Sequence, residues 1–236
     1  MTESGWQQPK KPTNISVYAD VCLQALSQAG LGHLLSLGGA FGLLHYWDYR
    51  STHDVDAWWR PESGSDERRQ VVDVLESALA GYGEVRIRRW GQVVSVELRE
   101  ANRTIFSFQI AERSALLEEP IAVDWTSTPI DSLPDLIASK MNALVERGAP
   151  RDFRDIHAIC QAGLTTPIQC WDLWRQRQLR AGSDTGLERA QLAVETHLER
   201  IEQSRPLEKI ADGGQRVVAQ QVREWYRKEF AHVQLD

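Results

Sequence analysis

The first half of the chain carries apolar residues at two different spacings. Over residues 16–29 and 67–80 they recur as on one side of a helix, and each run ends at glycines. Between these runs, residues 34–47 combine an apolar strand, a glycine turn and a short apolar helix, and a further strand is predicted over 54–59. This half is therefore expected to combine helices with a β-sheet.

Three more strand-like runs follow, over residues 84–89, 93–99 and 104–110, with turn residues between them. Consecutive short runs joined by tight turns predict an antiparallel meander. In the third run apolar and polar residues alternate, which gives that strand one apolar and one polar face. A short apolar run near 121–125 is expected to close an edge of the sheet.

The second half of the chain has a helical pattern to its end. Apolar residues there form one-sided stripes without strand-like alternation. The pattern predicts helices over residues 132–147, 150–161, 167–179, 186–203 and 215–232.

These patterns together predict an α+β fold, in which a mixed sheet flanked by helices is followed by a C-terminal helical region. The expected division is a flexible arm over residues 1–14, an α/β domain over 15–130 and a helical domain over 131–236. The arm is expected because its residues are polar and include two prolines.

Composition narrows the classes of function. Of the 236 residues 42% are hydrophobic and 25% are charged, as in ordinary globular proteins. The net charge of −6 argues against a globally basic nucleic-acid binder, although a local basic groove is compatible with it. No apolar run approaches the roughly 20 residues that span a bilayer, so no membrane association is expected.

The cysteines indicate a reducing compartment. Cys22, Cys160 and Cys170 are odd in number, show no metal-ligand spacing and fall in helix-like stretches. Buried, reduced thiols are the expected state, and a cytoplasmic location follows from it. The start of the chain also lacks the cationic and apolar segments of a secretory signal.

Asp54 and Asp56 are the first candidates for chemistry. Side chains alternate along a strand, so both carboxylates are expected on the same face. Such a pair suits a hard cation such as Mg²⁺. The competing interpretation is a solvated edge strand with a capping aspartate, which the apolar neighbours Val55 and Ala57 argue against because they indicate partial burial.

Gly38 and Gly39 precede these carboxylates at the start of the predicted short helix. Glycines allow a sharp turn there, and the backbone N–H groups at a helix start can bind phosphate. Transfer of a nucleotide from a triphosphate requires at least a phosphate-binding site beside carboxylates that bind Mg²⁺.

Two ordered blocks of sequence resemble one family. The first joins Gly38-Gly39 to the Arg-x-Thr-x-Asp-x-Asp-like stretch of residues 50–56. The second runs from 136 to 155 with the pattern Lys-x-x-Ala-Leu and then Arg-x-x-Pro-Arg-Asp-x-x-Asp. Together they are similar to the AbiEii-type nucleotidyltransferases of the DNA polymerase β-like superfamily, toxins of bacterial type IV toxin–antitoxin and phage-defence systems. The resemblance covers roughly residues 30–165.

The resemblance implies a polymerase β-like core, Mg²⁺ or Mn²⁺ as cofactor and a nucleoside triphosphate as substrate. It also implies an RNA acceptor such as tRNA, or a protein acceptor, and a cognate antitoxin protein. The residues implied as catalytic are Asp54, Asp56, Lys140 and Asp152, with Asp155 as a weaker candidate. The residues implied for nucleotide binding are Gly38, Gly39, Arg50 and Lys140.

Two positions depart from the family pattern. The family usually has a third metal-binding carboxylate on a later strand, where this chain has Gln109. An amide oxygen can bind a metal but cannot accept a hydroxyl proton, and Glu97 on the neighbouring strand is a second candidate ligand. A small hydroxylated residue often follows the two glycines in the family, but Ala40 stands there, and Ser36 before them is no obvious replacement.

Ordinary structural roles compete with several of these assignments. Lys140 lies on an apolar stripe and either extends out to solvent or projects into a cleft. Asp155 has the spacing of an intrahelical ion pair with Arg151, and Asp152 suits the first turn of a helix that begins at Pro150. Arg50 fits a phosphate contact or an acidic partner equally well.

Two functions from different classes therefore remain. The first is Mg²⁺-dependent transfer of a nucleotide to RNA or protein. The second is a non-catalytic nucleotide-binding or partner-binding module that kept the fold, which Gln109 and Ala40 favour.

Overall fold

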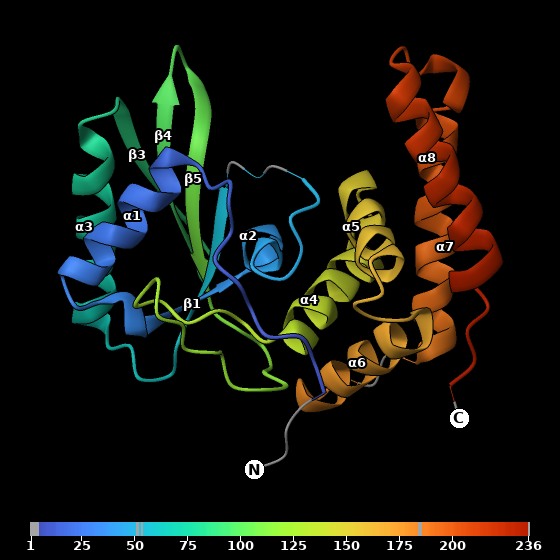
Figure 1. Cartoon of the computed structure of the whole chain (residues 1–236), viewed down its shortest axis with the longest axis horizontal. Coiled ribbons are helices and arrows are strands. Elements are labelled where there is room, and N and C mark those ends of the chain that lie inside the picture. Colours follow the sequence, from blue (N-terminus) through green and yellow to red (C-terminus); the bar gives the residue numbers. More distant parts are fainter. Residues whose placement is uncertain (1–4, 51, 53, 184–185, 236) are drawn as a thin grey trace. The chain divides into compact units, whose positions relative to one another are not determined.

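A computed structural model describes residues 5–50, 52, 54–183 and 186–235 of the chain. The fold is α+β with a mixed five-stranded sheet, as the sequence predicts (Figure 1). The chain forms two compact units, Met1–Leu136 and Ile137–Asp236. The first four residues of the predicted arm lie outside the described part.

The sheet belongs to the first unit and has the strand order β1-β2-β5-β4-β3. β2 and β5 are parallel, whereas every other neighbouring pair is antiparallel, so the predicted meander of β3, β4 and β5 is confirmed. The bounds are β1 Leu35–Gly38, β2 Asp54–Trp59, β3 Glu84–Trp90, β4 Val93–Glu100 and β5 Arg103–Ala111.

Helices lie on both sides of this sheet. Helices α1 (Val17–Gln28) and α3 (Ser65–Ala80) lie on one side, and the short helix α2 (Gly39–Leu44) lies on the other (Figure 1). The side with α1 and α3 holds the apolar core, where the ring of Tyr18 lies 5.7 Å from that of Phe106. Alternate residues of β2, β4 and β5 point away from this core, and those residues carry the candidate chemistry.

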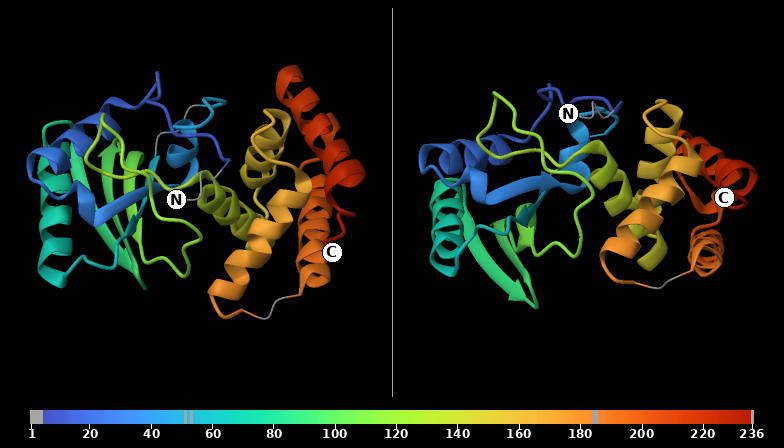
Figure 2. Two further views of the ribbon diagram at one scale, coloured as in Figure 1. Left: turned by 60° about the horizontal axis from the view of Figure 1, so that its bottom comes forward. Right: turned by 90° about the horizontal axis from the view of Figure 1, so that it is seen from below.

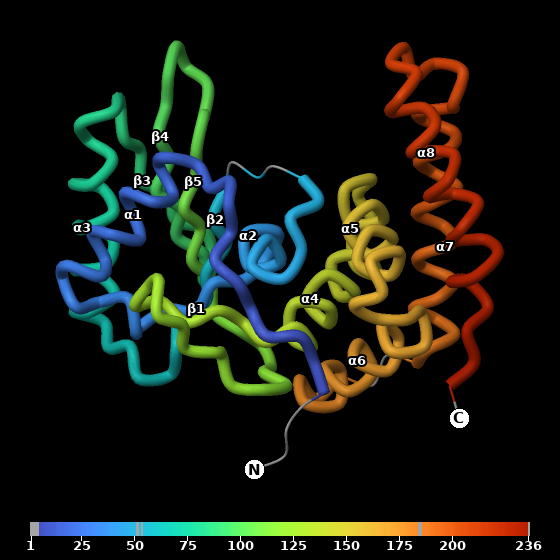
Figure 3. Tube along the Cα trace, viewed as in Figure 1, coloured from blue at the N-terminus to red at the C-terminus, as the bar shows by residue number. Residues whose placement is uncertain are grey.

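The edge of the sheet at β1 is closed by residues 129–131, where the chain passes on its way to the helical region (Figure 3). The N–H of Leu37 donates to Pro129 O, and the N–H of Asp131 donates to Leu37 O. The predicted run near 121–125 reaches this edge only at one residue, behind the segment that contacts β1. It contributes Ile121, which bridges to Ile130 instead.

The two units divide inside helix α4 (Leu133–Glu146), after Leu136, rather than at residue 130. The first turn of α4 is tied to the first unit because the Asp135 carboxylate accepts hydrogen bonds from the N–H groups of Leu117 and Glu118. A boundary drawn from sequence falls in the loop because such a side-chain anchor leaves no mark in the apolar pattern.

All regular secondary structure among the described residues of the second unit is helical. An aromatic core joins its segments: Phe153 packs against Tyr226 with ring centroids 4.7 Å apart, and Trp171 against Phe230 at 5.3 Å. After α4 come α5 Pro150–Gln161, α6 Pro167–Arg180, α7 Leu187–Ser204, the 3₁₀ turn η2 Leu207–Lys209, α8 Gly213–Trp225 and the π-helical turn η3 Tyr226–Phe230 (Figure 2).

The cysteines match the prediction except that Cys160 is only partly buried. All three are free and helical, Cys22 and Cys170 are buried, and burial raises the pKa of the Cys22 thiol to about 12. Segment 7–13 of the predicted arm is held against residues 45–48, for example by a hydrogen bond from Gln7 Nε2 to Tyr46 O. No helix within the described ranges has the length and apolar character that crossing a membrane requires.

Candidate functional site

The two carboxylates of β2 lie on one face of the sheet, as predicted. Along the strand Val55, Ala57 and Trp59 are buried, whereas Asp54 is exposed and Asp56 is half-buried. This alternation leaves the carboxylates on the side away from the α1–α3 core. The apolar residues hold the strand in place and so fix which face its acids occupy.

The glycine turn lies directly against Asp56. Gly38 pairs with Asp56 across β1 and β2, and Gly39 has a φ of +57°, in the left-handed region that favours glycine. A Cβ on Gly39 would lie 2.0 Å from Asp56 Oδ2, which no side chain permits. The turn therefore brings backbone and carboxylate closer together than any other residue would allow.

A chain of hydrogen bonds connects the position of the missing third carboxylate to Asp54. Gln109 pairs with Asp56 across β2 and β5, and its amide Nε2 donates to Ser107 Oγ at 3.2 Å. The Ser107 hydroxyl in turn donates to Asp54 Oδ1 at 2.7 Å. Ser107 thus fixes the Asp54 carboxylate, and this role was missed from the sequence although the alternation of β5 places Ser107 beside Gln109.

Glu97 lies on the same face but one strand further away. It pairs with Ser107 across β4 and β5, so it is two strands from Asp54, which corresponds to roughly 10 Å between backbones. Its carboxylate is nearly buried and lies 3.4 Å from Arg88 Nη1 and 3.4 Å from Thr104 Oγ1. No cluster of three or more His, Cys, Asp or Glu with metal-binding geometry occurs among the described residues.

The hydroxyl that the family carries after its glycines has no replacement at this turn. Ala40 is buried in the first turn of α2. Ser36 on β1 is occupied elsewhere, because its Oγ accepts a hydrogen bond from Arg113 Nη2 at 2.9 Å. Arg50, ahead of the carboxylate strand, is half-buried with its guanidinium 5.6 Å from the ring centre of Tyr49.

The second sequence block lies in the helical unit, and its charged residues are paired there. The ammonium Nζ of Lys140 on α4 lies 2.7 Å from Oδ2 of Asp155 on α5, and both side chains are buried. The predicted stripe on α4 is thus inward-facing, and Asp155 is paired with Lys140 of the neighbouring helix. A phosphate contact by Lys140 stays a prediction.

Asp152 is also fully buried and held on several sides. Its two carboxylate oxygens each accept a hydrogen bond of 2.9 Å from the Arg147 guanidinium, and Oδ2 also accepts one from the N–H of Ala149. The last contact caps the start of α5, where an acid is favourable. These contacts explain Asp152 by structure alone, and its catalytic role stays untested.

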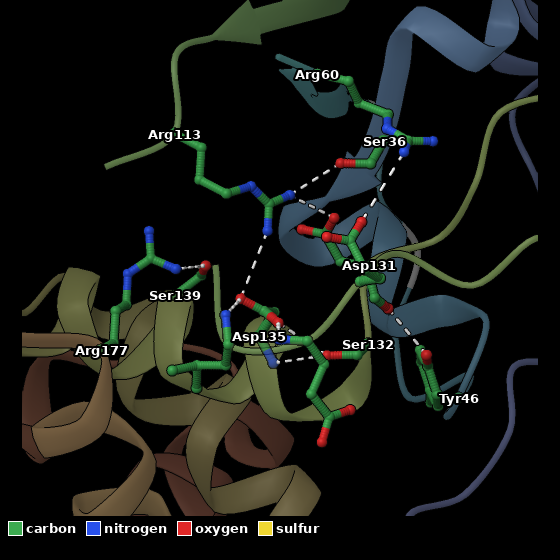
Figure 4. A network of polar contacts seen from close by, with 12 residues as sticks. Ser36, Tyr46, Arg60, Arg113, Asp131, Ser132, Asp135, Ser139 and Arg177 are labelled. Atoms are coloured by element: carbon green, nitrogen blue, oxygen red, sulfur yellow. Dashed lines mark hydrogen bonds and ion pairs between the residues drawn. The ribbon is translucent and has the colours of Figure 1, made fainter. Parts of the chain in front are cut away.

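A buried network beside the glycine turn was not predicted. Arg113 contacts Asp131 and Ser36 with Nη2, and its Nη1 lies 3.5 Å from Asp135 Oδ1 (Figure 4). Burial raises the pKa of the Asp131 carboxyl, and the Arg113 guanidinium opposes that rise. The ring of Trp58, two residues after Asp56, lies beneath Arg113 at 5.4 Å.

This network packs against the Gly38-Gly39 turn. A Cβ on Gly38 would lie 2.3 Å from Trp58 Nε1 and 3.1 Å from Asp131 Oδ2, so the network packs directly against the turn. One signal was available in the sequence, because Ser132-x-x-Asp135 has the spacing of a capping box. Asp131 and Arg113 gave no such signal, since their contact joins separate loops.

Comparison with known proteins identifies the family. The family model described as "Nucleotidyl transferase AbiEii toxin, Type IV TA system" matches residues 21–234. No curated protein matches this chain. Among solved structures, a protein of H. pylori described as a candidate nucleotidyltransferase is 16% identical with a TM-score of 0.49, over 89% of this chain and 94% of that one. On the family match, which spans most of its length, this chain belongs to the AbiEii nucleotidyl transferase toxin family.

Proposed function

We propose that the protein transfers a nucleotide from a nucleoside triphosphate to a hydroxyl of RNA, with Mg²⁺ or Mn²⁺ as cofactor. The observation that carries the proposal is the position of Asp56 against the Gly38-Gly39 turn, with Asp54 on the same face. Two carboxylates and the amide of Gln109 on the adjacent strand form an oxygen-rich donor set of the kind that a hard divalent cation prefers.

In this proposal Asp54 and Asp56 hold the cation, which would neutralise the triphosphate and stabilise the charge that develops at its α-phosphorus. The backbone of the glycine turn binds phosphate oxygens. The acceptor oxygen bonds to the α-phosphorus, the bond to the leaving pyrophosphate breaks, and the hydroxyl proton passes to water or to a β2 carboxylate. Gln109 cannot accept it, and β5 carries no acid.

Exposed side chains on β3, on the same face of the sheet as the carboxylates, favour RNA over a protein as the acceptor. Strand pairing places Arg88 in the row of Asp56 and Gln109, and Arg86 in the row of Asp54. Both arginines are exposed on the edge strand β3, three strands or roughly 14 Å from the carboxylates. The Arg88 guanidinium lies 5.3 Å from the ring of Trp90, which is 45% exposed.

Exposed arginines beside an exposed indole provide phosphate contacts and a stacking surface for an unpaired base. This surface is local, so it is compatible with the net charge of −6. The family also implies a cognate antitoxin. A cytoplasmic site of action is part of the proposal, because the three cysteines are free thiols.

The second candidate function is a non-catalytic nucleotide-binding module. Gln109 favours it, because an amide adds no negative charge for a second ion and no base at that position. Ala40 favours it as well, because the turn lacks a hydroxyl contact to phosphate. Positioning and metal electrostatics supply most of the acceleration in phosphoryl transfer, so two aspartates retain a route to activity.

The test is incorporation of label from each of the four nucleoside triphosphates into total bacterial RNA, with Mg²⁺ or Mn²⁺. The wild-type protein is expected to label RNA, and Asp56→Asn to label it about 100- to 1,000-fold more slowly, as for loss of one main electrostatic group. Arg86→Ala with Arg88→Ala is expected to weaken RNA binding while triphosphate binding is retained.

Gln109→Asp separates the two candidate functions. Increased labelling would show that the amide weakens an enzyme, and lost labelling would show that the amide is adapted to its role. If neither protein labels RNA or protein with any nucleotide while both bind a triphosphate, the non-catalytic module is the correct function.

A further inference from the structure

The helical unit carries a groove that the proposed chemistry does not use. It has a volume of about 450 Å³ and lies between α5, α7 and α8, within residues 150–223. Its apolar lining comes from all three helices and from the segment that connects the last two: Phe153, Leu198, Ile201, Ile210, Val218 and Val222. A concave apolar surface of this size is within the range of ligand-binding sites.

The charge of the groove has one sign. Its charged lining residues are Arg154, Arg205 and Arg223, one from each side, and no acid lines it. This is unusual for a chain with 33 acidic and 27 basic side chains. None of the three guanidiniums has a carboxylate within 4 Å among the described residues.

The three arginines differ in burial. Arg154 and Arg205 are exposed, whereas Arg223 is 7% exposed and donates to the backbone carbonyl of Arg205. The nearby acids line other hollows: Glu202 and Glu224 lie in one that shares Arg223, and Asp212 lies in one that shares Arg205, where its Oδ1 accepts a hydrogen bond from the N–H of Gln215. Arg154 and Arg205 are therefore the cations that this groove offers to a ligand.

The exposed beginning of α8 continues the groove lining, and Val217 adds one apolar side chain beyond it. Residues 213–218 are all exposed, and they include Val217 at 55% and Val218 at 39% exposure. One and a half helical turns correspond to roughly 9 Å of surface, which is longer than a compact small ligand covers. A segment of polypeptide would cover both the groove and this helix start.

We infer that this groove binds an acidic amphipathic segment of a partner protein. Apolar side chains of the segment occupy the floor formed by Phe153, Leu198 and Val222, and its Asp or Glu residues pair with Arg154 and Arg205. This is helix-in-groove recognition, in which apolar anchors supply the binding energy and charges supply the choice of partner. The inference concerns the helical unit alone and does not depend on nucleotidyl transfer.

The experiment is an unbiased selection of 16-residue display peptides on the full-length protein, followed by fluorescence anisotropy with the selected peptides. We expect the selected sequences to combine Leu, Ile or Phe at helical spacing with an excess of Asp and Glu. Arg154→Glu with Arg205→Glu is expected to weaken their binding at least tenfold. Ala219→Trp, which fills the groove from α8, is expected to weaken it as strongly.

The matched control is Arg189→Glu with Arg200→Glu, which makes the same charge change at exposed positions of α7 that do not line the groove. It is expected to leave binding within twofold of the wild type. Circular dichroism melting of all variants shows that each is folded, so a loss of binding is not a loss of structure.

Four outcomes would overturn the inference. Selected peptides without acidic bias, or peptides that bind the groove variants and the control equally, would place binding elsewhere. A wild-type dimer that the Arg154→Glu and Arg205→Glu changes convert to a monomer would make a second copy the occupant. Displaceable binding of decanoate, with no peptide selected, would make the groove a site for small amphipathic anions.

Discussion

The molecule contains two pairs of aspartates with opposite surroundings. Asp152 and Asp155 in the helical unit are fully buried, and each is paired with a cation, Arg147 or Lys140. Asp54 and Asp56 in the sheet unit point to an open face, beside a serine and a glycine turn. The first pair is explained by the structure it stabilises, whereas the second pair lies where a ligand can reach it.

The difference shows that a match to a family's sequence motif does not by itself assign a functional role to a residue. Both pairs belong to the motifs that resemble the family, yet only the β2 pair is accessible to solvent and lies beside the glycine turn. Burial distinguishes the two pairs. A buried carboxylate without its cation lowers the stability of the fold strongly, whereas a carboxylate in contact with solvent needs no such cation.

The largest effect on stability is expected from breaking the buried pair of the helical unit. Asp155→Asn leaves the Lys140 ammonium buried without its counter-charge, so the free energy of unfolding should fall by about 3–5 kcal/mol. Urea denaturation followed by circular dichroism measures it.

Asp54→Asn is the matched control, since it removes one charge from an exposed residue with one hydrogen bond from Ser107. Its expected loss is below about 1.5 kcal/mol. Equal losses for the two variants would show that the contrast between the two pairs is wrong.

A smaller, pH-dependent effect is expected from His45, a buried ionisable group with no carboxylate within 4 Å among the described residues. Burial lowers the pKa of His45 to about 4, and its ring Nδ1 lies 3.0 Å from Phe41 O. The unfolded chain, with an ordinary pKa near 6.5, therefore binds more protons than the folded chain between these values. The free energy of unfolding therefore has its full value, as far as His45 is concerned, above about pH 6.5. It should fall by about 3 kcal/mol as the pH drops to about 4.

His45→Gln is the control for this prediction, because an amide occupies the position without titrating. The difference in unfolding free energy between the two proteins isolates His45 from other groups such as Asp131, whose pKa is raised. A difference that does not change between pH 7 and pH 4 would contradict the burial of a neutral imidazole.

Most of the fold was predictable from sequence because its determinants are local. Alternation fixed the faces of β2 and β5, and the glycines marked the turn before α2. The strand order was not predictable, because the parallel pairing of β2 with β5 joins strands that are far apart in the chain. The edge formed by residues 129–131 depends on the same kind of long-range contact.

The site was predictable in part for the same reason. The carboxylate pair and the glycine turn are visible as short patterns, and the structure brings Asp56 against Gly39. The Ser107 link to Asp54 and the network of Arg113 with Asp131 were not, because each joins segments separated in sequence. The pairing of Lys140 with Asp155 depends likewise on how two helices pack.

The central claim is that Asp54 and Asp56 hold a divalent cation and that the buried aspartates do not. Binding of Mn²⁺, followed by electron paramagnetic resonance with and without a nucleoside triphosphate, tests it most directly. The wild-type protein and Asp152→Asn, at a temperature where that variant is folded, are expected to bind Mn²⁺ alike. Asp56→Asn is expected to bind it at least tenfold more weakly. Equal binding by all three proteins, or loss of binding in Asp152→Asn alone, would contradict the claim.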